Sequence, residues 1–513
     1  MLHTHLIAPI PELLKRHAQE RGDKVAYRDA QSALTYAQLE QRTGRLAAHL
    51  ADAGLAAGDT VAILLPNGTQ WVEACFAIAR AGALSVPISY EASEPEIAYR
   101  LADANCRAIV TTAERGDLVA RLKANAPNLA TVIATNRGGR RDDALSYESL
   151  LATAPGSDPR DPALMHEPAF ILYTSGTTGR AKGVLLTVHG MLWIVAACWA
   201  PIAGLCERDT MLSPLPLFHS YALNLSVLGV LATGASEYIM ERFSTAEAMR
   251  LLKTGEFTCF PGVPTMFHYL MQGAEGDAKL PGLRVCISAG AIMPATLNRA
   301  FEERFGIPLL DGYGITETST MVTMNWPSGG RVYGSCGFPV PGLAVRIVDP
   351  VSHDDVAQGQ EGELIVRGPN VMPGYLNKPE ETAKALRNGW YHTGDLAKAD
   401  ENNFLTITGR LKELIIRGGQ NIAPAEIEEV VNTYPAVLDC AVVGAPHQHL
   451  GEVPVLFVVA RAGQAIETDA LLGHCGARLS AYKVPRTVHI IKEIPRTGSG
   501  KIIRYKLKEL LSR

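Results

Sequence analysis

The sequence predicts an α/β fold: a large N-terminal domain of α/β subdomains plus a β-rich subdomain, followed by a small α+β C-terminal domain. The first observation is an alternation of short apolar runs with amphipathic helical patterns over residues 1–150, which is typical of βαβ units around a mostly parallel sheet. The second observation is length. A chain of 513 residues exceeds what one hydrophobic core usually supports, so two or more domains are expected.

The N-terminal part contains the clearest elements. Thr35 and Gln38 match a helix capping box, and apolar residues then recur at helical spacing up to Gly54. Continuous apolar runs bounded by Pro or Gly predict buried strands. The predicted strands are at 61–65, 84–88 and 108–112, with a helix at 70–81. The same alternation continues from Phe170 to about Pro341.

After Pro341 the pattern changes. Residues 345–348 and 363–367 are short β-type runs separated by Gly and Pro, which predicts a β-rich subdomain. A boundary is expected just after Arg410, because the remaining segment of about 100 residues has a normal domain size. The sequence thus predicts an N-terminal domain over 1–410 and a C-terminal domain over 411–513.

Composition favours an enzyme that acts on a small molecule. The formal net charge is only -4 and no basic stripe stands out, so we expect no nucleic-acid partner. Nine cysteines are scattered without a Cys-x-x-Cys pair, which favours free thiols in a reducing cytoplasm over disulfides or a zinc site. The N-terminal residues lack the apolar core of a secretory signal.

One apolar run has to be distinguished from a membrane span. Residues 191–205 form the longest such run, but it contains Pro201 and is too short to cross a bilayer. We therefore expect a buried helix there, no integral membrane segment, and a cytoplasmic protein.

A segment rich in small and hydroxyl-bearing residues, YTSGTTGRAKG, occupies 173–183. Backbone N–H groups without bulky neighbours, hydroxyls and one cation, here Lys182, suit the oxygens of a nucleotide triphosphate. The spacing is not that of a Walker A loop, because Ala181 stands where that motif has Gly and no Ser or Thr follows Lys182. An ordinary surface turn is the competing interpretation.

Four further motifs weaken that alternative: GYGITET at 312–318, YHTGDL at 391–396, GRLKELI at 409–415 and PRTGSGK at 495–501. In this order, the five motifs resemble the adenylate-forming superfamily of acyl- and aryl-CoA synthetases, non-ribosomal-peptide adenylation domains and firefly-type luciferases, over essentially the whole chain. The resemblance implies an ATP-dependent acid:CoA ligase that forms an acyl-adenylate with release of pyrophosphate, and then a thioester. It also implies ATP, Mg²⁺ and coenzyme A as cofactors, and a mobile C-terminal domain.

The resemblance assigns nucleotide-binding roles along the chain. Attack of a carboxylate on the α-phosphorus needs mainly positioning and charge neutralisation, because both groups are negative. The phosphate loop would use Thr174, Ser175, Gly176, Thr177, Thr178, Gly179 and Lys182. Glycines would admit the flat base and a tyrosine would stack on it in the adenine site. That site would use Ser288, Gly290, Ala291, Asp311, Gly312, Tyr313 and Gly314.

Five more residues would act at the reacting groups by the same resemblance. Thr316 is expected at the α-phosphate and Glu317 on Mg²⁺, which prefers carboxylate and phosphate oxygens; a first-turn helix acid is the alternative for Glu317. Asp395 would bind both ribose hydroxyls with help from Arg410, unless it merely forms a turn. Lys501 would bridge the carboxylate and the α-phosphate, whereas a local interpretation makes it one more exposed lysine.

Two features concern the second half-reaction. Lys412 corresponds to the hinge about which the C-terminal domain of the family rotates. Gly418 and Gly419 resemble the loop that lines the pantetheine tunnel, where a thin arm passes close to the backbone. A hairpin turn is the alternative for this pair of glycines.

The acyl pocket implied by the resemblance is walled by mostly small or apolar residues: Ala197, His219, Tyr221, Asn224, Val263, Ala289, Gly290 and Ile315. No Arg or Lys stands at these positions to pair a second carboxylate, and no acid stands there to pair an ammonium. A monocarboxylic acid is therefore expected. His219 is expected to contact the substrate, and a buried His satisfied by backbone groups is the competing interpretation.

The identity of the acid and the acceptor stays open at this stage. Small residues such as Ala289 and Gly290 leave room for a fatty chain or a flat ring. We expect a medium- or long-chain fatty acid first and an aryl acid second. An acyl carrier protein is an alternative acceptor to coenzyme A, and a luciferase-like oxygenase is a more distant alternative.

Overall fold

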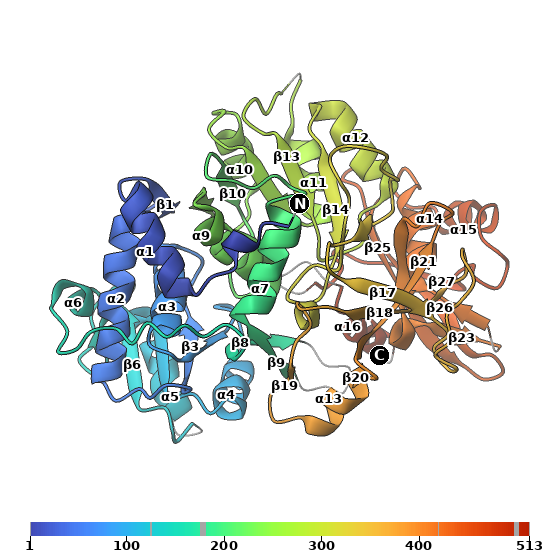
Figure 1. Ribbon diagram of the computed structural model, residues 1–513. Coiled ribbons are helices and arrows are strands. Elements are labelled where there is room, and N and C mark those ends of the chain that lie inside the picture. The colour runs from blue at the N-terminus through green and yellow to red at the C-terminus, as the bar shows by residue number, and fades with distance from the viewer. Residues whose placement is uncertain are drawn as a thin grey trace.

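The computed structural model describes residues 2–123, 126–174, 181–276, 278–418, 420–496 and 502–511. Four β-sheets organise this part of the chain (Figure 1). Two large, mostly parallel sheets form the α/β subdomains, a third sheet forms the β-rich subdomain, and a fourth forms the C-terminal domain. The predicted α/β architecture, with a large N-terminal domain and a small C-terminal one, is confirmed.

The first large sheet carries the segments on both sides of the predicted phosphate loop. Its described strands follow the order β19-β9-β8-β4-β3-β5-β6-β7. Their bounds are Gly374–Tyr375 (β19), Lys182–Thr187 (β9), Pro168–Thr174 (β8), Leu84–Pro87 (β4), Thr60–Leu64 (β3), Ala108–Thr112 (β5), Thr131–Thr135 (β6) and Leu145–Ser146 (β7). The helices of this subdomain are α2 (Tyr36–Asp52), α3 (Thr69–Arg80), α4 (Glu94–Asp103), α5 (Gly116–Lys123) and α6 (Tyr147–Ala152).

The local predictions for this region hold to within one residue at each boundary. Thr35 and Gln38 form the predicted capping box, because the Thr35 hydroxyl accepts the Gln38 N–H and the Gln38 side chain accepts the Thr35 N–H at 2.9 Å. The predicted strands 61–65, 84–88 and 108–112 correspond to β3, β4 and β5, which pair in parallel. Their side chains are almost all buried, which explains the continuous apolar runs.

The second large sheet carries the segments predicted to bind adenine. Its described order is β16-β15-β14-β13-β12-β10-β11-β1-β2. The bounds are Phe338–Pro339 (β16), Thr323–Met324 (β15), Leu309–Tyr313 (β14), Val285–Ser288 (β13), Cys259–Gly262 (β12), Thr210–Ser213 (β10), Ser236–Ile239 (β11), Val25–Arg28 (β1) and Ala33–Thr35 (β2). Its helices include α1 (Ile10–Arg21), α10 (Thr245–Leu252), α11 (Pro264–Gly273) and α12 (Ala295–Phe305).

The apolar run at 191–205 is a buried helical segment, as predicted. Helix α7 (Val188–Ile194) continues into a π-helical stretch, Val195–Trp199, and a second π-helical stretch at Leu223–Gly229 follows α8 (Ser220–Ala222) and precedes α9 (Val230–Thr233). Figure 1 shows α7 running between the two large sheets. Side chains from this helix and from both sheets share one hydrophobic core.

The β-rich subdomain and the C-terminal domain follow. The third sheet contains β17 (Ala344–Val348), β18 (Gly362–Arg367), β20 (Leu386–Arg387), β21 (Trp390–Ala399) and β22 (Leu405–Arg410), and α13 (Pro379–Ala385) lies beside it. The fourth contains β23 (Ile415–Arg417), β24 (Gln420–Ile422), β25 (Val437–His447), β26 (Gly451–Ala460) and β27 (Thr487–Ile490), with α14 (Pro424–Asn432), α15 (Thr468–Gly476) and α16 (Arg504–Leu510). The expected boundary at 410/411 falls between β22 and β23.

Two further expectations concern the whole chain. All nine cysteines are free thiols, as their spacing predicts. Among the described residues, no helix is both long enough and apolar enough to cross a membrane.

Candidate active site

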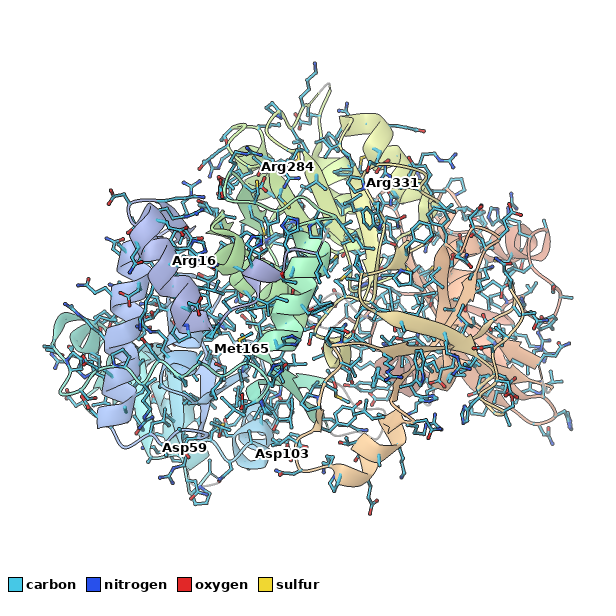
Figure 2. The ribbon with its side chains drawn as sticks, viewed as in Figure 1. Arg16, Asp59, Asp103, Met165, Arg284 and Arg331 are labelled. Carbon is cyan, nitrogen blue, oxygen red and sulfur yellow. The ribbon has the colours of Figure 1, made fainter. Side chains whose placement is uncertain are left out.

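The two ends of the phosphate-loop motif lie on an antiparallel pair of strands. Strands β8 and β9 place Thr174 opposite Lys182, so the two ends of the motif meet across the ladder. Strand β8 is anchored to helix α4 at the first residue of the motif, because the Tyr173 hydroxyl donates to Asp103 at 2.8 Å (Asp103 is labelled in Figure 2). The predicted phosphate ligands Ser175, Gly176, Thr177, Thr178 and Gly179 lie outside the described residues.

Lys182 stands in a small polar cluster that the sequence did not predict. Its ammonium pairs with the Glu381 carboxylate and lies 5.0 Å from the centroid of the Tyr375 ring. Tyr375 reaches this place because the short strand β19 pairs with β9. The Tyr375 hydroxyl in turn donates to Glu317 Oε1 at 3.0 Å. One tyrosine therefore links the predicted phosphate cation to the predicted metal ligand.

Glu317 has the properties of a hard-cation ligand. It lies in a 3-10 turn, Thr316–Thr318, which is separated from the end of β14 by two residues. Burial raises the pKa of the Glu317 carboxyl above its usual range, and the Tyr375 hydrogen bond partly opposes that rise. A bound divalent cation would offset the cost of burying this charge. The carboxylate present therefore fits the predicted Mg²⁺, which would neutralise phosphate charge when ATP is bound.

The strand ends β13 and β14 supply the polar groups expected around adenine. Ser288 pairs with Asp311 across the parallel ladder. Both side chains are buried, and neither Ser288 Oγ nor Asp311 Oδ1 has a hydrogen-bond partner among the described atoms. Burial raises the pKa of Asp311 well above its usual range. Buried polar atoms without partners are rare in proteins, so this pair fits a site that a polar ligand completes.

The GYGITET segment is constrained by close backbone contacts. A Cβ atom at Gly314 would lie 1.4 Å from the Thr320 carbonyl oxygen, so only glycine fits there. The following Thr316 is buried, and its hydroxyl lies 3.2 Å from that of Ser220, which begins α8. The predicted α-phosphate ligand is thus held against the start of α8.

Asp395, the predicted ribose ligand, is a buried acid with two strong donors. It is 2% exposed. The Tyr313 hydroxyl donates to Asp395 Oδ2 at 2.6 Å, and Arg410 Nε lies 2.7 Å from Oδ1. Strands β21 and β22 place Asp395 and Arg410 opposite each other. Burial, together with the neighbouring Asp395 charge, raises the pKa of Tyr313 well above its usual range, so the tyrosine remains a donor.

The predicted acyl-pocket residues come from several elements and differ in exposure. Tyr221 donates to the Ile287 carbonyl at 3.1 Å, and its N–H contacts His219 Nδ1 at 3.4 Å. Val263 lies beside Gly290, whose φ is +86°. Ala197 and Asn224 are completely buried, and Ala289 is nearly so, whereas His219, Ile315 and Gly290 are partly or fully exposed.

The described residues that are predicted to serve thioester formation, Lys412 and Gly418, lie at the start of the C-terminal domain. Lys412 is exposed in the 3-10 turn Leu411–Glu413, between β22 and β23. Gly418 has a φ of +59° and stands in the tight turn between β23 and β24, where Arg417 pairs with Gln420. The hairpin alternative is therefore correct for its conformation, and the tunnel role stays a prediction. Gly419 and Lys501 lie outside the described residues.

Comparison with known proteins identifies the family. Residues 14–376 match the AMP-binding enzyme family, and residues 426–501 match the AMP-binding enzyme C-terminal domain. A feruloyl-CoA synthase from Amycolatopsis sp is 36% identical, over 95% of this chain and 96% of its own. A long-chain-fatty-acid--CoA ligase from Bacillus subtilis is 32% identical, over 98% of this chain and 94% of the ligase. The crystal structure of an anthranilate CoA ligase with anthranoyl-AMP matches with a TM-score of 0.92 at 25% identity, over 99% of this chain and 98% of the ligase chain.

The fold and the site together define an AMP-forming acid:CoA ligase that uses ATP and coenzyme A. The chain belongs to the AMP-binding enzyme family, and the resemblance drawn from the five motifs is confirmed. The comparisons include ligases for both aromatic and fatty acids, so membership of the family leaves the acid open.

Proposed function

We propose that the chain activates a compact, ring-bearing monocarboxylic acid and transfers it to coenzyme A. The acid oxygen would attack the α-phosphorus of ATP, the bond to the β-phosphate would break, and pyrophosphate would leave. The thiol of coenzyme A would then attack the acyl carbonyl and release AMP. In this scheme Lys182 and its loop hold the β- and γ-phosphates, Thr316 and Lys501 act at the α-phosphate, and Asp395 with Arg410 holds the ribose.

The observation that carries the choice of acid is the burial and hydrogen bonding of Asn224, one of the residues predicted to wall the acyl pocket. Asn224 is 0% exposed, and its side chain is fully engaged with the protein. Its amide donates to the carbonyls of Met191 at 2.9 Å and Ser319 at 3.0 Å, while its oxygen accepts the Trp199 indole N–H at 2.6 Å. Moving these groups aside for a long chain would break a buried polar network, which is costly.

Trp199 packs beside two of the predicted wall residues, Asn224 and Tyr221. It is fully buried, and its ring centroid lies 6.1 Å from that of Tyr221. The more open predicted wall positions are His219, Ile315 and Gly290. A pocket that Asn224 and Trp199 limit in depth would suit a flat ring better than an extended alkyl chain. For this reason we place an aryl acid before a fatty acid, the reverse of the order expected from sequence.

The charges around the predicted pocket also favour a monocarboxylic acid. The residues assigned to its wall carry no Lys, Arg, Asp or Glu side chain. A second carboxylate or an ammonium on the substrate would be buried without a partner at these positions, at a cost of several kcal/mol. The similarity to a feruloyl-CoA synthase and to an anthranilate CoA ligase further supports an aromatic acid.

A test compares pyrophosphate release across a panel of acids, with and without coenzyme A. The decisive pair is a phenylpropenoic acid and a linear saturated acid with the same number of carbons, because both have one carboxylate and differ in shape. We expect kcat/KM to be at least about tenfold higher for the ring acid, a difference of about 1.4 kcal/mol. A preference for the linear acid, or for a longer one, would contradict the proposed substrate class.

The same panel of acids also separates the acceptors, when pyrophosphate exchange and oxygen dependence are measured beside pyrophosphate release. Sustained turnover with free coenzyme A is expected. Pyrophosphate exchange with poor turnover on coenzyme A would favour a carrier protein, and oxygen-dependent release of light or CO₂ would favour an oxygenase.

A further inference from the structure

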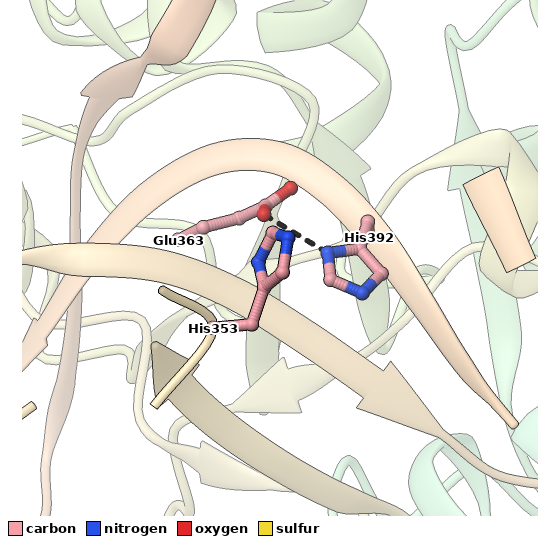
Figure 3. A group of neighbouring side chains, drawn as sticks. All are labelled: His353, Glu363 and His392. Carbon is pink, nitrogen blue, oxygen red and sulfur yellow. Dashed lines mark hydrogen bonds and ion pairs between the residues drawn. The ribbon is translucent and has the colours of Figure 1, made fainter. Parts of the chain in front are cut away.

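Three metal-ligating side chains converge in the β-rich subdomain, and one of them lies on β21, the strand that carries Asp395. Figure 3 shows His353, Glu363 and His392 pointing toward one another. One ligand atom from each lies within 4.8 Å of the other two. We propose that these three residues bind a divalent transition-metal ion of the Zn²⁺ class. The inference does not depend on which acid the enzyme activates.

Two of the three ligands already form a close pair. Glu363, on β18, is 4% exposed, and its Oε2 lies 3.0 Å from His392 Nδ1 on β21. Ligand atoms at about 2.0–2.2 Å from a tetrahedral zinc ion lie roughly 3.3–3.6 Å from each other. The Glu363–His392 pair therefore needs only a small adjustment to share an ion.

The third ligand is presented by a compact turn between β17 and β18. Asp349 Oδ1 accepts the N–H groups of Val351 and Ser352, each at 2.8 Å, and the His353 N–H donates to the Asp349 carbonyl at 2.9 Å. His353 has a φ of +63°, a left-handed conformation that is costly for residues other than glycine. The turn brings its ring to 5.4 Å from that of His392, between centroids.

The donor set selects the class of ion. Two imidazoles and one carboxylate suit Zn²⁺ and similar transition metals, whereas Mg²⁺ and Ca²⁺ prefer sites made entirely of oxygen. The cluster is therefore distinct in chemistry from the Mg²⁺ site predicted at Glu317. One neighbour opposes a cation: Arg387 Nη1 lies 3.2 Å from His353 Nε2. Its guanidinium would have to move aside, which lowers the expected affinity.

An ion at this place would brace the ribose-binding turn. Glu363 Oε1 accepts the Gly394 N–H at 3.0 Å, and Gly394 directly precedes Asp395. Thr393 also ties this turn to β18, because its hydroxyl donates to the Leu364 carbonyl at 2.6 Å. Fixing Glu363 and His392 on one ion would hold both ends of the short segment that leads to Asp395.

The test is a calorimetric titration of the full chain with Zn²⁺ in the presence of excess Mg²⁺. The main variant is His353→Asn, because asparagine tolerates the left-handed turn and binds zinc weakly. His166→Asn is the matched control, since His166 is also exposed and also lies against a second imidazole, that of His189, at 4.6 Å between centroids. Arg387→Gln removes the opposing charge.

We expect His353→Asn to weaken the tightest zinc site at least about tenfold, the loss that even an outer-shell partner can cause. His166→Asn should titrate like the wild type, and Arg387→Gln should bind several-fold more tightly. Unchanged binding in His353→Asn, or an equal loss in His166→Asn, overturns the proposal. An Arg387→Gln protein that binds no more tightly than the wild type also counts against it, and that variant does not disturb the ligands.

Discussion

Replacing Asp395 with Asn should damage ATP use far more than it damages folding. The wild-type carboxylate is buried, with Tyr313 at 2.6 Å on one oxygen and Arg410 at 2.7 Å on the other. Asparagine keeps one acceptor oxygen but replaces the other with an NH₂ donor. Arg410 can only donate, so the amide oxygen should turn toward it and the NH₂ toward the Tyr313 oxygen.

The size of the effect follows from the change of charge. A hydrogen bond to a charged acceptor contributes about 1.5–3 kcal/mol, against about 0.5–1.5 kcal/mol for a neutral one. Two ribose hydroxyls would therefore lose about 2–3 kcal/mol together, which is about 30–150-fold in kcat/KM for ATP. The loss in stability should be nearer 1 kcal/mol, because the Arg410 side chain is 38% exposed and water can solvate it.

The assay is pyrophosphate release at varied ATP, with the acid held constant and saturating. Asp209→Asn is the matched control: Asp209 is also buried and pairs with Arg284 Nη2 at 2.6 Å (Arg284 is labelled in Figure 2), but no role at the nucleotide is assigned to it. The control should be less stable and should keep its KM for ATP. The ribose assignment would be refuted if Asp395→Asn kept a kcat/KM for ATP within threefold of the wild type. It would also be refuted if Asp209→Asn lost as much kcat/KM as Asp395→Asn does.

Three other outcomes are expected. Tyr375→Phe removes the hydroxyl that donates to Glu317, so the Mg²⁺ concentration needed for half-maximal pyrophosphate release should rise about tenfold. The control is the remote Tyr333→Phe, which loses a hydrogen bond to another glutamate and should leave that Mg²⁺ concentration unchanged. Lys501→Ala should abolish adenylate formation and spare thioester formation from a supplied adenylate; loss of both half-reactions would contradict its assigned role. Burial raises the pKa of Glu237 well above its usual range, so the native state retains this proton and loses stability as pH rises from the unfolded pKa through the folded one. Glu237→Gln should therefore raise the melting temperature at pH 8 more than at pH 5, and an equal change at both values would count against a buried, protonated acid.

The sequence by itself determined the α/β class, the strands and one capped helix of the first subdomain, the free thiols and the family. These features depend on local patterns: a continuous apolar run predicts a buried strand, and Thr35 with Gln38 marks a helix start, whatever lies elsewhere in the chain. The five motifs also predict which residues bind the nucleotide and the metal, because phosphate and ribose recognition uses short, contiguous loops, and these assignments stay predictions.

Only the tertiary structure decided what surrounds those loops. Tyr375 is separated in sequence from both Lys182 and Glu317, and nothing local marks it, yet the pairing of β19 with β9 brings its ring and its hydroxyl to both. The hydrogen-bond network of Asn224 and the convergence of three metal-ligating side chains likewise arise from distant segments. A local pattern records which face of an element is buried, but the neighbours of that face are set by how the elements pack.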